Sequence, residues 1–268
     1  MPNLSFQIIL PAFIAGVDIF HVIHGVCLRH IQAKITAARL AKDTHHLSDP
    51  GVQFTLALIM SSAIVRSMAF LCALPLIPLF LLHLQNPAKN AFVVQDANQY
   101  YGLAIVALFN GEYLWEIVHT PTTPPVMIAH HVISISLCAV SCHCRLFDDM
   151  GFAYAFGVLI LHPLLLAKFL RHAKCSWSYP VWRFGIYYFH VAEVLGTMIS
   201  VYTMYCQNLP PLELILKSVT VLMLTLVKCA LAKNVRKGLG KCTTIKCDVT
   251  NAVVTDILGL PDMSSWLY

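Results

Sequence analysis

Ionisable side chains interrupt an apolar stretch of the sequence between positions 100 and 137. Two glutamates and three histidines stand there in otherwise hydrophobic sequence: Glu112, Glu116, His119, His130 and His131. Ionisable groups at membrane depth are costly, so they usually face the interior of a helix bundle or a hydrated cavity. Histidine titrates near neutral pH, and a carboxylate can orient its ring for proton transfer. The stretch therefore predicts a site for binding or catalysis.

The spacing of other polar residues predicts a shared cavity. Asp18, His21 and His24 recur at every third position, which keeps them on roughly one face of a helix. The pair formed by His190 and Glu193 repeats this spacing. One polar cavity that opens towards the cytosol explains why each helix carries its polar residues on one face. The residues expected to line it are Asp18, His21, His24, Glu112, Tyr113, Glu116, His119, His162, His190 and Glu193.

A structural role is the alternative for each of these residues. Polar side chains also hold membrane helices together through hydrogen bonds worth about 1 kcal/mol or less. For a single residue such as Asp18, this structural role is the stronger interpretation. For Glu116, His130 and His131 together, a role in binding or catalysis is the stronger one.

The composition is that of an integral membrane protein. The chain of 268 residues is 58% hydrophobic and 12% charged, and its mean hydropathy is +0.70. An ordinary soluble domain carries roughly 25% charged residues. Basic loops beside the membrane explain the net charge of +5, and no basic face with interspersed aromatic residues indicates a nucleic-acid partner. The polar residues in the first apolar stretch favour a retained span over a cleaved signal peptide.

Ten scattered cysteines do not form a recognisable metal motif. Cys142, His143 and Cys144 form one candidate ligand set, and Cys242 with Cys247 forms another. Zinc sites usually need four ligands in paired CxxC or HxxxH spacing, which this chain lacks. We therefore expect ordinary thiols, no bound metal and no cofactor.

Hydropathy predicts an all-α, polytopic helical bundle with about seven transmembrane helices. A spanning helix needs about 20 predominantly apolar residues. The candidate spans are 6–28, 52–85, 100–119, 125–145, 151–170, 180–206 and 211–232. The second candidate is too long for one straight span, and Pro75 and Pro78 predict a kink within it.

The distribution of basic residues predicts the orientation in the membrane. Basic residues gather in 29–42, in 168–183 and after position 232. If 52–85 crosses the membrane once, all three clusters lie on one side, which the positive-inside rule makes cytosolic. The N-terminus is then lumenal and the C-terminus cytosolic. Arg66 is expected to lie near the cytosolic interface, with its charged end reaching water.

A short connection rich in threonine and proline, residues 120–125, is expected to join two of these helices. The two segments on either side of it resemble a known membrane family. They read G-E-Y-L-W-E-I from position 111 and A-H-H-V-I-S-I-S-L from position 129. This pattern resembles the TLC domain, whose family includes ceramide synthases, translocon-associated membrane proteins and lipid-homeostasis proteins. Tyr113 and Glu116 match its tyrosine and acidic positions, and His130 and His131 match its paired histidines.

The resemblance divides the chain into three parts and implies its location in the cell. Residues 1–49 hold the first transmembrane helix and a basic cytosolic loop, residues 50–235 a TLC-like six-helix membrane domain, and residues 236–268 a cytosolic tail. The family implies residence in the endoplasmic reticulum and agrees with the orientation derived from charge. Pro163 and Leu166 stand where ceramide synthases carry carboxylates, so the chain resembles the non-synthase branch.

Three functions remain open from the sequence. The first is binding or sensing of a membrane lipid in the polar cavity, in the service of membrane lipid homeostasis. The second is a lipid acyltransferase that uses acyl-CoA, with His130 or His131 as general base and Glu116 orienting the imidazole. The third is a metal-dependent membrane hydrolase or oxygenase with histidine ligands, which the isolated pairs and single HxxH favour least. The identity of the lipid and the oligomeric state also remain open.

Overall fold

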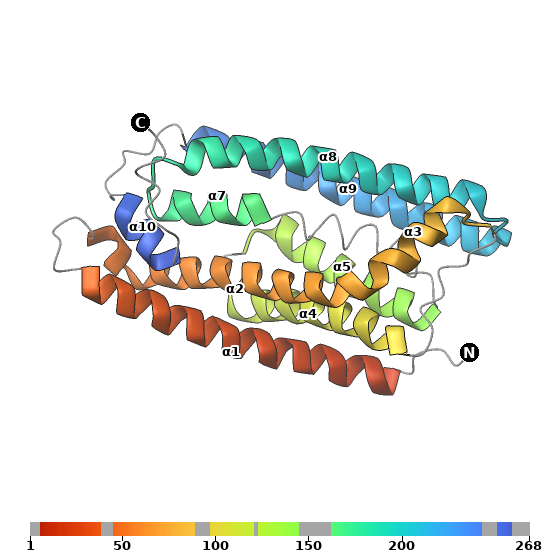
Figure 1. The fold of residues 1–268 in the computed structure, drawn as a ribbon, viewed down its shortest axis with the longest axis horizontal. Helices are drawn as coiled ribbons and strands as arrows, with labels where there is room; N and C mark the ends of the chain where they lie inside the picture. The colour runs from red at the N-terminus through yellow and green to blue at the C-terminus, as the bar shows by residue number, and fades with distance from the viewer. Residues whose placement is uncertain are drawn as a thin grey trace. The chain divides into compact units, whose positions relative to one another are not determined.

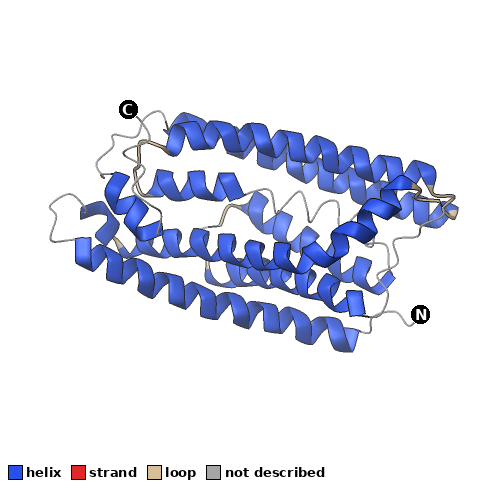
Figure 2. Ribbon diagram, in the orientation of Figure 1, coloured by secondary structure: helices blue, strands red, loops and turns tan. Residues whose placement is uncertain are grey.

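A computed structural model of the chain describes residues 6–38, 45–88, 97–120, 123–144, 162–242 and 251–258. All regular secondary structure in these ranges is helical (Figure 2). The helices shown in Figure 1 are α1 (Phe6–Ala38), η1 (His45–Ser48), α2 (Pro50–Ala73), η2 (Leu74–Leu76), α3 (Ile77–Gln85), α4 (Ala97–His119), α5 (Pro125–Cys144), α7 (His162–His172), α8 (Ser178–Cys206), α9 (Pro211–Cys242) and α10 (Asn251–Leu258). The predicted all-α class is confirmed for this part of the chain.

Prolines set several of the helix boundaries. Pro50, Pro125 and Pro211 each begin a helix, where the missing backbone N–H removes no intrahelical hydrogen bond. Pro75 and Pro78 fall where α2 passes through the short 3₁₀ turn η2 into α3. The predicted interruption of this long apolar segment therefore occurs at its two prolines.

Within the described ranges, three helical stretches are long and apolar enough to cross a membrane: Gln7–Ala37, Pro50–Gln85 and Ser178–Cys206. Apolar side chains on these helices point outwards, as lipid-facing residues do. Leu10, Val22 and Leu71, for example, are 60%, 63% and 62% exposed. These features support an integral membrane protein. The count of seven spans stays a prediction, and most of the candidate 151–170 lies outside the described residues.

The chain divides into two compact units, each assembled from three segments. Unit 1 comprises Met1–Phe20, Val65–Ile160 and His190–Ala232, and unit 2 comprises His21–Ile64, Leu161–Phe189 and Lys233–Tyr268. The unit boundaries fall inside α1, α2, α8 and α9, so each of these helices contributes residues to both units. The division into 1–49, 50–235 and 236–268 stays a prediction.

In unit 1, α1 packs directly against α4 because both helices carry small residues at their contact. A Cβ atom added to Gly16 would overlap the carbonyl oxygen of Ala107, and one added to Gly111 would overlap the backbone of Gly16. Small residues allow membrane helices to approach this closely. Near this contact the rings of Phe20 and Trp115, both buried, lie 5.1 Å apart. The close approach fixes the position of α4, which carries most of the candidate site.

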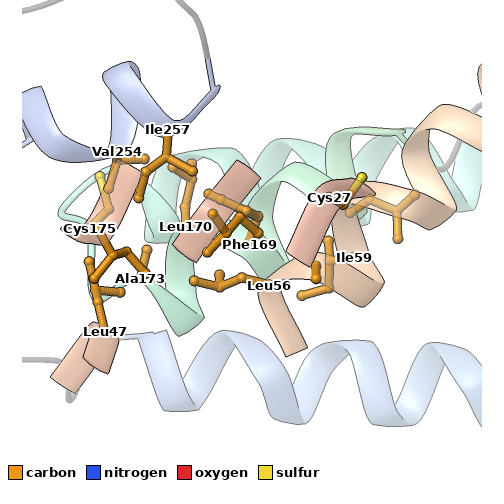
Figure 3. Close-up of a cluster of buried hydrophobic side chains, with 14 residues drawn as sticks. Cys27, Leu47, Leu56, Ile59, Phe169, Leu170, Ala173, Cys175, Val254 and Ile257 are labelled. Atoms are coloured by element: carbon orange, nitrogen blue, oxygen red, sulfur yellow. The ribbon is translucent and has the colours of Figure 1, made fainter. Parts of the chain in front are cut away.

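In unit 2, α1, α2, α7 and α10 enclose an apolar core. Figure 3 shows Leu56, Phe169 and Ile257 among the side chains that meet there. Two polar contacts also tie α10 to α1: the His30 ring nitrogen lies 3.0 Å from the carbonyl oxygen of Ile257, and Lys34 pairs with Asp256 at 2.8 Å. The C-terminal helix is therefore an integral part of unit 2.

Unit 2 also holds α8 against α9 through a buried tryptophan. The indole nitrogen of Trp182 donates to the carbonyl oxygen of Val235 at 2.8 Å, and the Arg171 guanidinium lies 4.8 Å from the ring centre. A side chain larger than hydrogen at Gly238 would overlap the same indole. The residues of α9 in this contact lie beyond position 232, where its apolar span was predicted to end. The helix itself continues to Cys242.

Candidate functional site

A short connection in unit 1 brings the end of α4 against the beginning of α5. The α4 helix ends at His119 and α5 begins at Pro125, and the two helices lie side by side (Figure 1). The Thr120 hydroxyl contacts the Glu116 carbonyl oxygen and the Thr123 hydroxyl, and Thr123 donates back to the Thr120 carbonyl at 2.7 Å. The two hydroxyl groups thus donate hydrogen bonds to backbone carbonyl oxygens at the end of α4. Carbonyl oxygens at a helix end lack partners within the helix.

The connection places a carboxylate beside a buried imidazole. His131 Nε2 lies 2.8 Å from Glu116 Oε2, and the His131 side chain is only 2% exposed. Within the described part of the chain, His131 Nδ1 is buried and has no hydrogen-bond partner. In the neutral tautomer that fits this geometry, Nε2–H donates to the carboxylate and Nδ1 carries the free lone pair. This nitrogen is available to accept a proton or a hydrogen bond.

Aromatic contacts fix the orientation of the imidazole. The ring of Tyr113 stacks on His131 with 4.5 Å between ring centres and 24° between planes. The same tyrosine contacts His130 edge-on at 5.6 Å, and Ser134 Oγ lies 3.4 Å from His130 Nδ1. His131 Nε2 contacts the Glu116 carboxylate, whereas His130 Nδ1 lies near the Ser134 hydroxyl. The paired histidines therefore differ in their surroundings.

A buried ion pair lies one turn along α4 from Glu116. Arg66 donates from two nitrogens to the two carboxylate oxygens of Glu112, at 2.8 and 3.3 Å. Glu112 is fully buried and Arg66 is 9% exposed, and the guanidinium also interacts electrostatically with Glu116. The prediction that Arg66 reaches towards water at the membrane interface is therefore wrong. A buried carboxylate on the neighbouring helix binds its charge inside the protein.

Another member of the predicted set, His119, stands at the end of α4 and contacts Trp115. The ring of His119 stacks on Trp115 with 4.5 Å between centres, and its Nδ1 lies 3.1 Å from the Trp115 carbonyl oxygen. The His119 side chain is exposed. It therefore contacts the last turn of its own helix.

The other predicted residues lie on different elements. On α1, Asp18 and His21 are exposed, whereas His24 is buried with its ring 4.9 Å from Phe54. In unit 2, His162 Nε2 lies 3.2 Å from the Ala63 carbonyl oxygen. His190 and Glu193 are half-buried on the part of α8 that belongs to unit 1. The single cavity expected to join all these residues stays a prediction.

Two residues of this region were missed by sequence reasoning. Arg66 was assigned to the interface because its partner lies 46 positions away. Asn110 was overlooked because it carries no charge. It is fully buried on α4, and neither its amide nitrogen nor its amide oxygen has a hydrogen-bond partner within the described residues. The sequence signal that could have identified Asn110 is a polar residue within an apolar stretch, two positions before Glu112.

Among the residues that the structure describes, no group of three or more histidine, cysteine, aspartate or glutamate side chains has the geometry to hold a metal ion. Glu116 and His131 form a pair rather than a ligand set of three or four. The side chains of Cys142, His143 and Cys144 lie outside the described part of the structure, as does Cys247.

Comparison of the chain with protein-family models, with curated proteins and with solved structures finds no match. The resemblance to the TLC domain therefore rests on the two sequence segments around Tyr113 and His131.

Proposed function

We propose that the protein binds a membrane lipid at the Glu116–His131 pair and acts in membrane lipid homeostasis. The observation that carries this proposal is the buried His131 Nδ1, which has no hydrogen-bond partner within the described residues, while Nε2 of the same ring contacts the Glu116 carboxylate. Lipid sites are mostly apolar with a few convergent polar groups, and this pair is surrounded by apolar helices. The polar head of the lipid would bind at His131 while its chain lies along the exposed apolar helix faces.

A second candidate is acyl transfer from acyl-CoA, and the same hydrogen bond favours it. A carboxylate that fixes an imidazole is the arrangement that general-base catalysis uses. His131 Nδ1 would take the proton of an attacking hydroxyl or amine as the new bond to the acyl carbon forms. The carbon–sulfur bond then breaks, and the leaving thiolate of coenzyme A takes up that proton.

The proposed setting is a TLC-like bundle of seven spans in the endoplasmic reticulum, with a lumenal N-terminus and a cytosolic C-terminus. The three described helical stretches that can cross a membrane are compatible with it. Basic residues support the orientation because Arg183, Arg236 and Lys237 are all exposed on unit 2. The lumenal and cytosolic assignments follow from this charge distribution and from the resemblance.

Two measurements on the full chain distinguish the candidates. Lipidomic analysis of cells with and without the protein identifies the lipid class whose level depends on it. Incubation of the purified protein with acyl-CoA of several chain lengths, beside the variant His131→Ala, then tests for turnover. Turnover that the variant lacks supports the transferase, and a lipid change without turnover supports the binding protein. No lipid change and no turnover would contradict both.

A further inference from the structure

The guanidinium of Arg66 interacts with two carboxylates of α4. It donates to both oxygens of Glu112, from Nη2 at 2.8 Å and from Nε at 3.3 Å, and it interacts electrostatically with Glu116. Glu112 and Glu116 are four positions apart, so their side chains lie on the same face of the helix. The two carboxylates are therefore alternative partners for one arginine.

The partner that Arg66 binds affects the candidate site. Glu116 Oε2 lies 2.8 Å from His131 Nε2. Arginine binds a carboxylate best through two parallel hydrogen bonds, one to each oxygen. If Arg66 bound Glu116 in this way, it would neutralise the charge that strengthens the hydrogen bond from His131. The observed pairing of Arg66 with Glu112 avoids this competition.

Burial explains why Arg66 binds Glu112. The Glu112 side chain has no exposed surface, whereas the Glu116 side chain is 18% exposed. An unpaired charge costs more in an apolar interior than where water reaches it. The arginine therefore stabilises the protein most at Glu112, and Glu116 is left to His131.

We propose that Glu112 is a positioning residue for the Glu116–His131 pair. Because Glu112 binds Arg66 at both carboxylate oxygens, the guanidinium is kept from Glu116, and the Glu116 carboxylate stays available to His131. The hydrogen bond at Nε2 then fixes the tautomer in which Nδ1 carries the lone pair. This inference rests on the proposed function, because it states how the lipid site keeps its acceptor nitrogen.

The test follows the His131 Nε2 proton by nuclear magnetic resonance. The full chain, labelled with ¹⁵N-histidine, is studied in phosphatidylcholine nanodiscs. A ring N–H that donates to a carboxylate resonates downfield of other ring protons, and His131→Gln identifies the signal by its loss. Glu112→Met should abolish the downfield shift, because Arg66 then pairs with Glu116. The double variant, Arg66→Met with Glu112→Met, removes the competing cation as well, so the downfield signal should return.

Lipids extracted from the same purified proteins and quantified by mass spectrometry give a second readout. Glu112→Met should retain about five- to ten-fold less of the lipid class enriched in the wild type, the difference between hydrogen bonds to charged and neutral groups. The double variant should retain the wild-type amount. Glu213→Met removes a carboxylate from its pair with Lys217 in the same unit, so it is the matched control and should change neither readout.

The outcomes separate this inference from the proposed function. A downfield His131 signal that persists in folded Glu112→Met would overturn the inference, as would its absence from the folded double variant. If Glu112→Met does not fold, the double variant alone decides. Equal lipid loss in Glu213→Met and Glu112→Met would also overturn the inference. Equal lipid retention in wild type and His131→Ala would instead contradict the proposed function, while the resonance measurement still decides the role of Glu112.

Discussion

His131 Nε2 lies 2.8 Å from Glu116 Oε2, and this single bond joins α5 to the last turn of α4. Because the imidazole is buried and the carboxylate is only 18% exposed, the two side chains depend on each other. Removing either side chain removes this hydrogen bond. The pair is therefore a unit of stability as well as the candidate site.

Glu116→Leu and His131→Leu should each destabilise the protein by about 1.5–3 kcal/mol, the range for a hydrogen bond to a charged group. The double variant should lose less than the sum of the two, because the hydrogen bond between the two side chains can be lost only once. Thermal unfolding of the four proteins in detergent measures this coupling. Additive losses would show that the bond contributes no interaction energy.

Breaking the buried ion pair between Arg66 and Glu112 should destabilise the protein more than breaking the Glu116–His131 hydrogen bond. Arg66→Met leaves the fully buried Glu112 without its cation and should cost about 3–5 kcal/mol. Replacing both residues with methionine should recover most of this loss, because an apolar pair of similar size carries no desolvation penalty. Unfolding measurements on the single and double variants check this. A double variant as unstable as Arg66→Met would contradict the account.

The contact between α1 and α4 depends on the absence of a side chain at Gly111. Gly111→Ala places a Cβ atom against the backbone of Gly16, so the helices must separate, at a cost of about 1–3 kcal/mol. The matched control is Gly102→Ala on the same helix, where a Cβ atom meets nothing within 4 Å. Melting temperatures of the two variants should differ clearly. Equal melting temperatures would mean that the close approach is unimportant.

Apolar contacts rather than surface charge should hold α10 in unit 2. Ile257 is 1% exposed within the core, so Ile257→Ala should cost about 2–5 kcal/mol of local stability. The Lys34–Asp256 pair is largely exposed, so Asp256→Asn should cost no more than about 1 kcal/mol. Hydrogen exchange of residues 251–258 reports both effects. Faster exchange in Asp256→Asn than in Ile257→Ala would reverse this assignment.

The proposed membrane orientation places residues 86–98 in the lumen. A glycosylation acceptor inserted there should be modified when the protein is made in membranes of the endoplasmic reticulum. An acceptor inserted after position 242 should stay unmodified because this orientation places the tail in the cytosol. Electrophoresis before and after removal of glycans shows the difference. An unmodified acceptor in 86–98 would contradict the single crossing of 52–85.

The predicted spans agree with the described helices at several starts and at several ends. The starts of α5 at Pro125 and α9 at Pro211 match the predicted spans, as do the ends of α4 at His119 and α8 at Cys206. The predicted first and last spans, 6–28 and 211–232, stop short of α1 and α9, which continue to Ala38 and Cys242. Hydropathy marks the apolar part of a helix, whereas the backbone hydrogen bonds of a helix continue through charged sequence.

The candidate site was predictable only where its residues are close in sequence. Glu116, His130 and His131 lie on either side of one short connection, so their proximity followed from two adjacent helices. The partnership of Arg66 with Glu112 joins segments 46 positions apart, and periodicity within one helix carries no information about it. Asn110 became notable only when the structure placed its amide in the interior, with no hydrogen-bond partner among the described residues.

The most direct test of the central claim is the lipid that remains bound to the purified protein. Mass spectrometry of lipids extracted from wild type, His131→Ala and His130→Ala compares the two neighbouring histidines, of which His131 forms the ion pair with Glu116. The account predicts one enriched lipid class in the wild type, its loss by about ten-fold or more in His131→Ala, and a smaller loss in His130→Ala. The same lipid profile in wild type and in folded His131→Ala would contradict it.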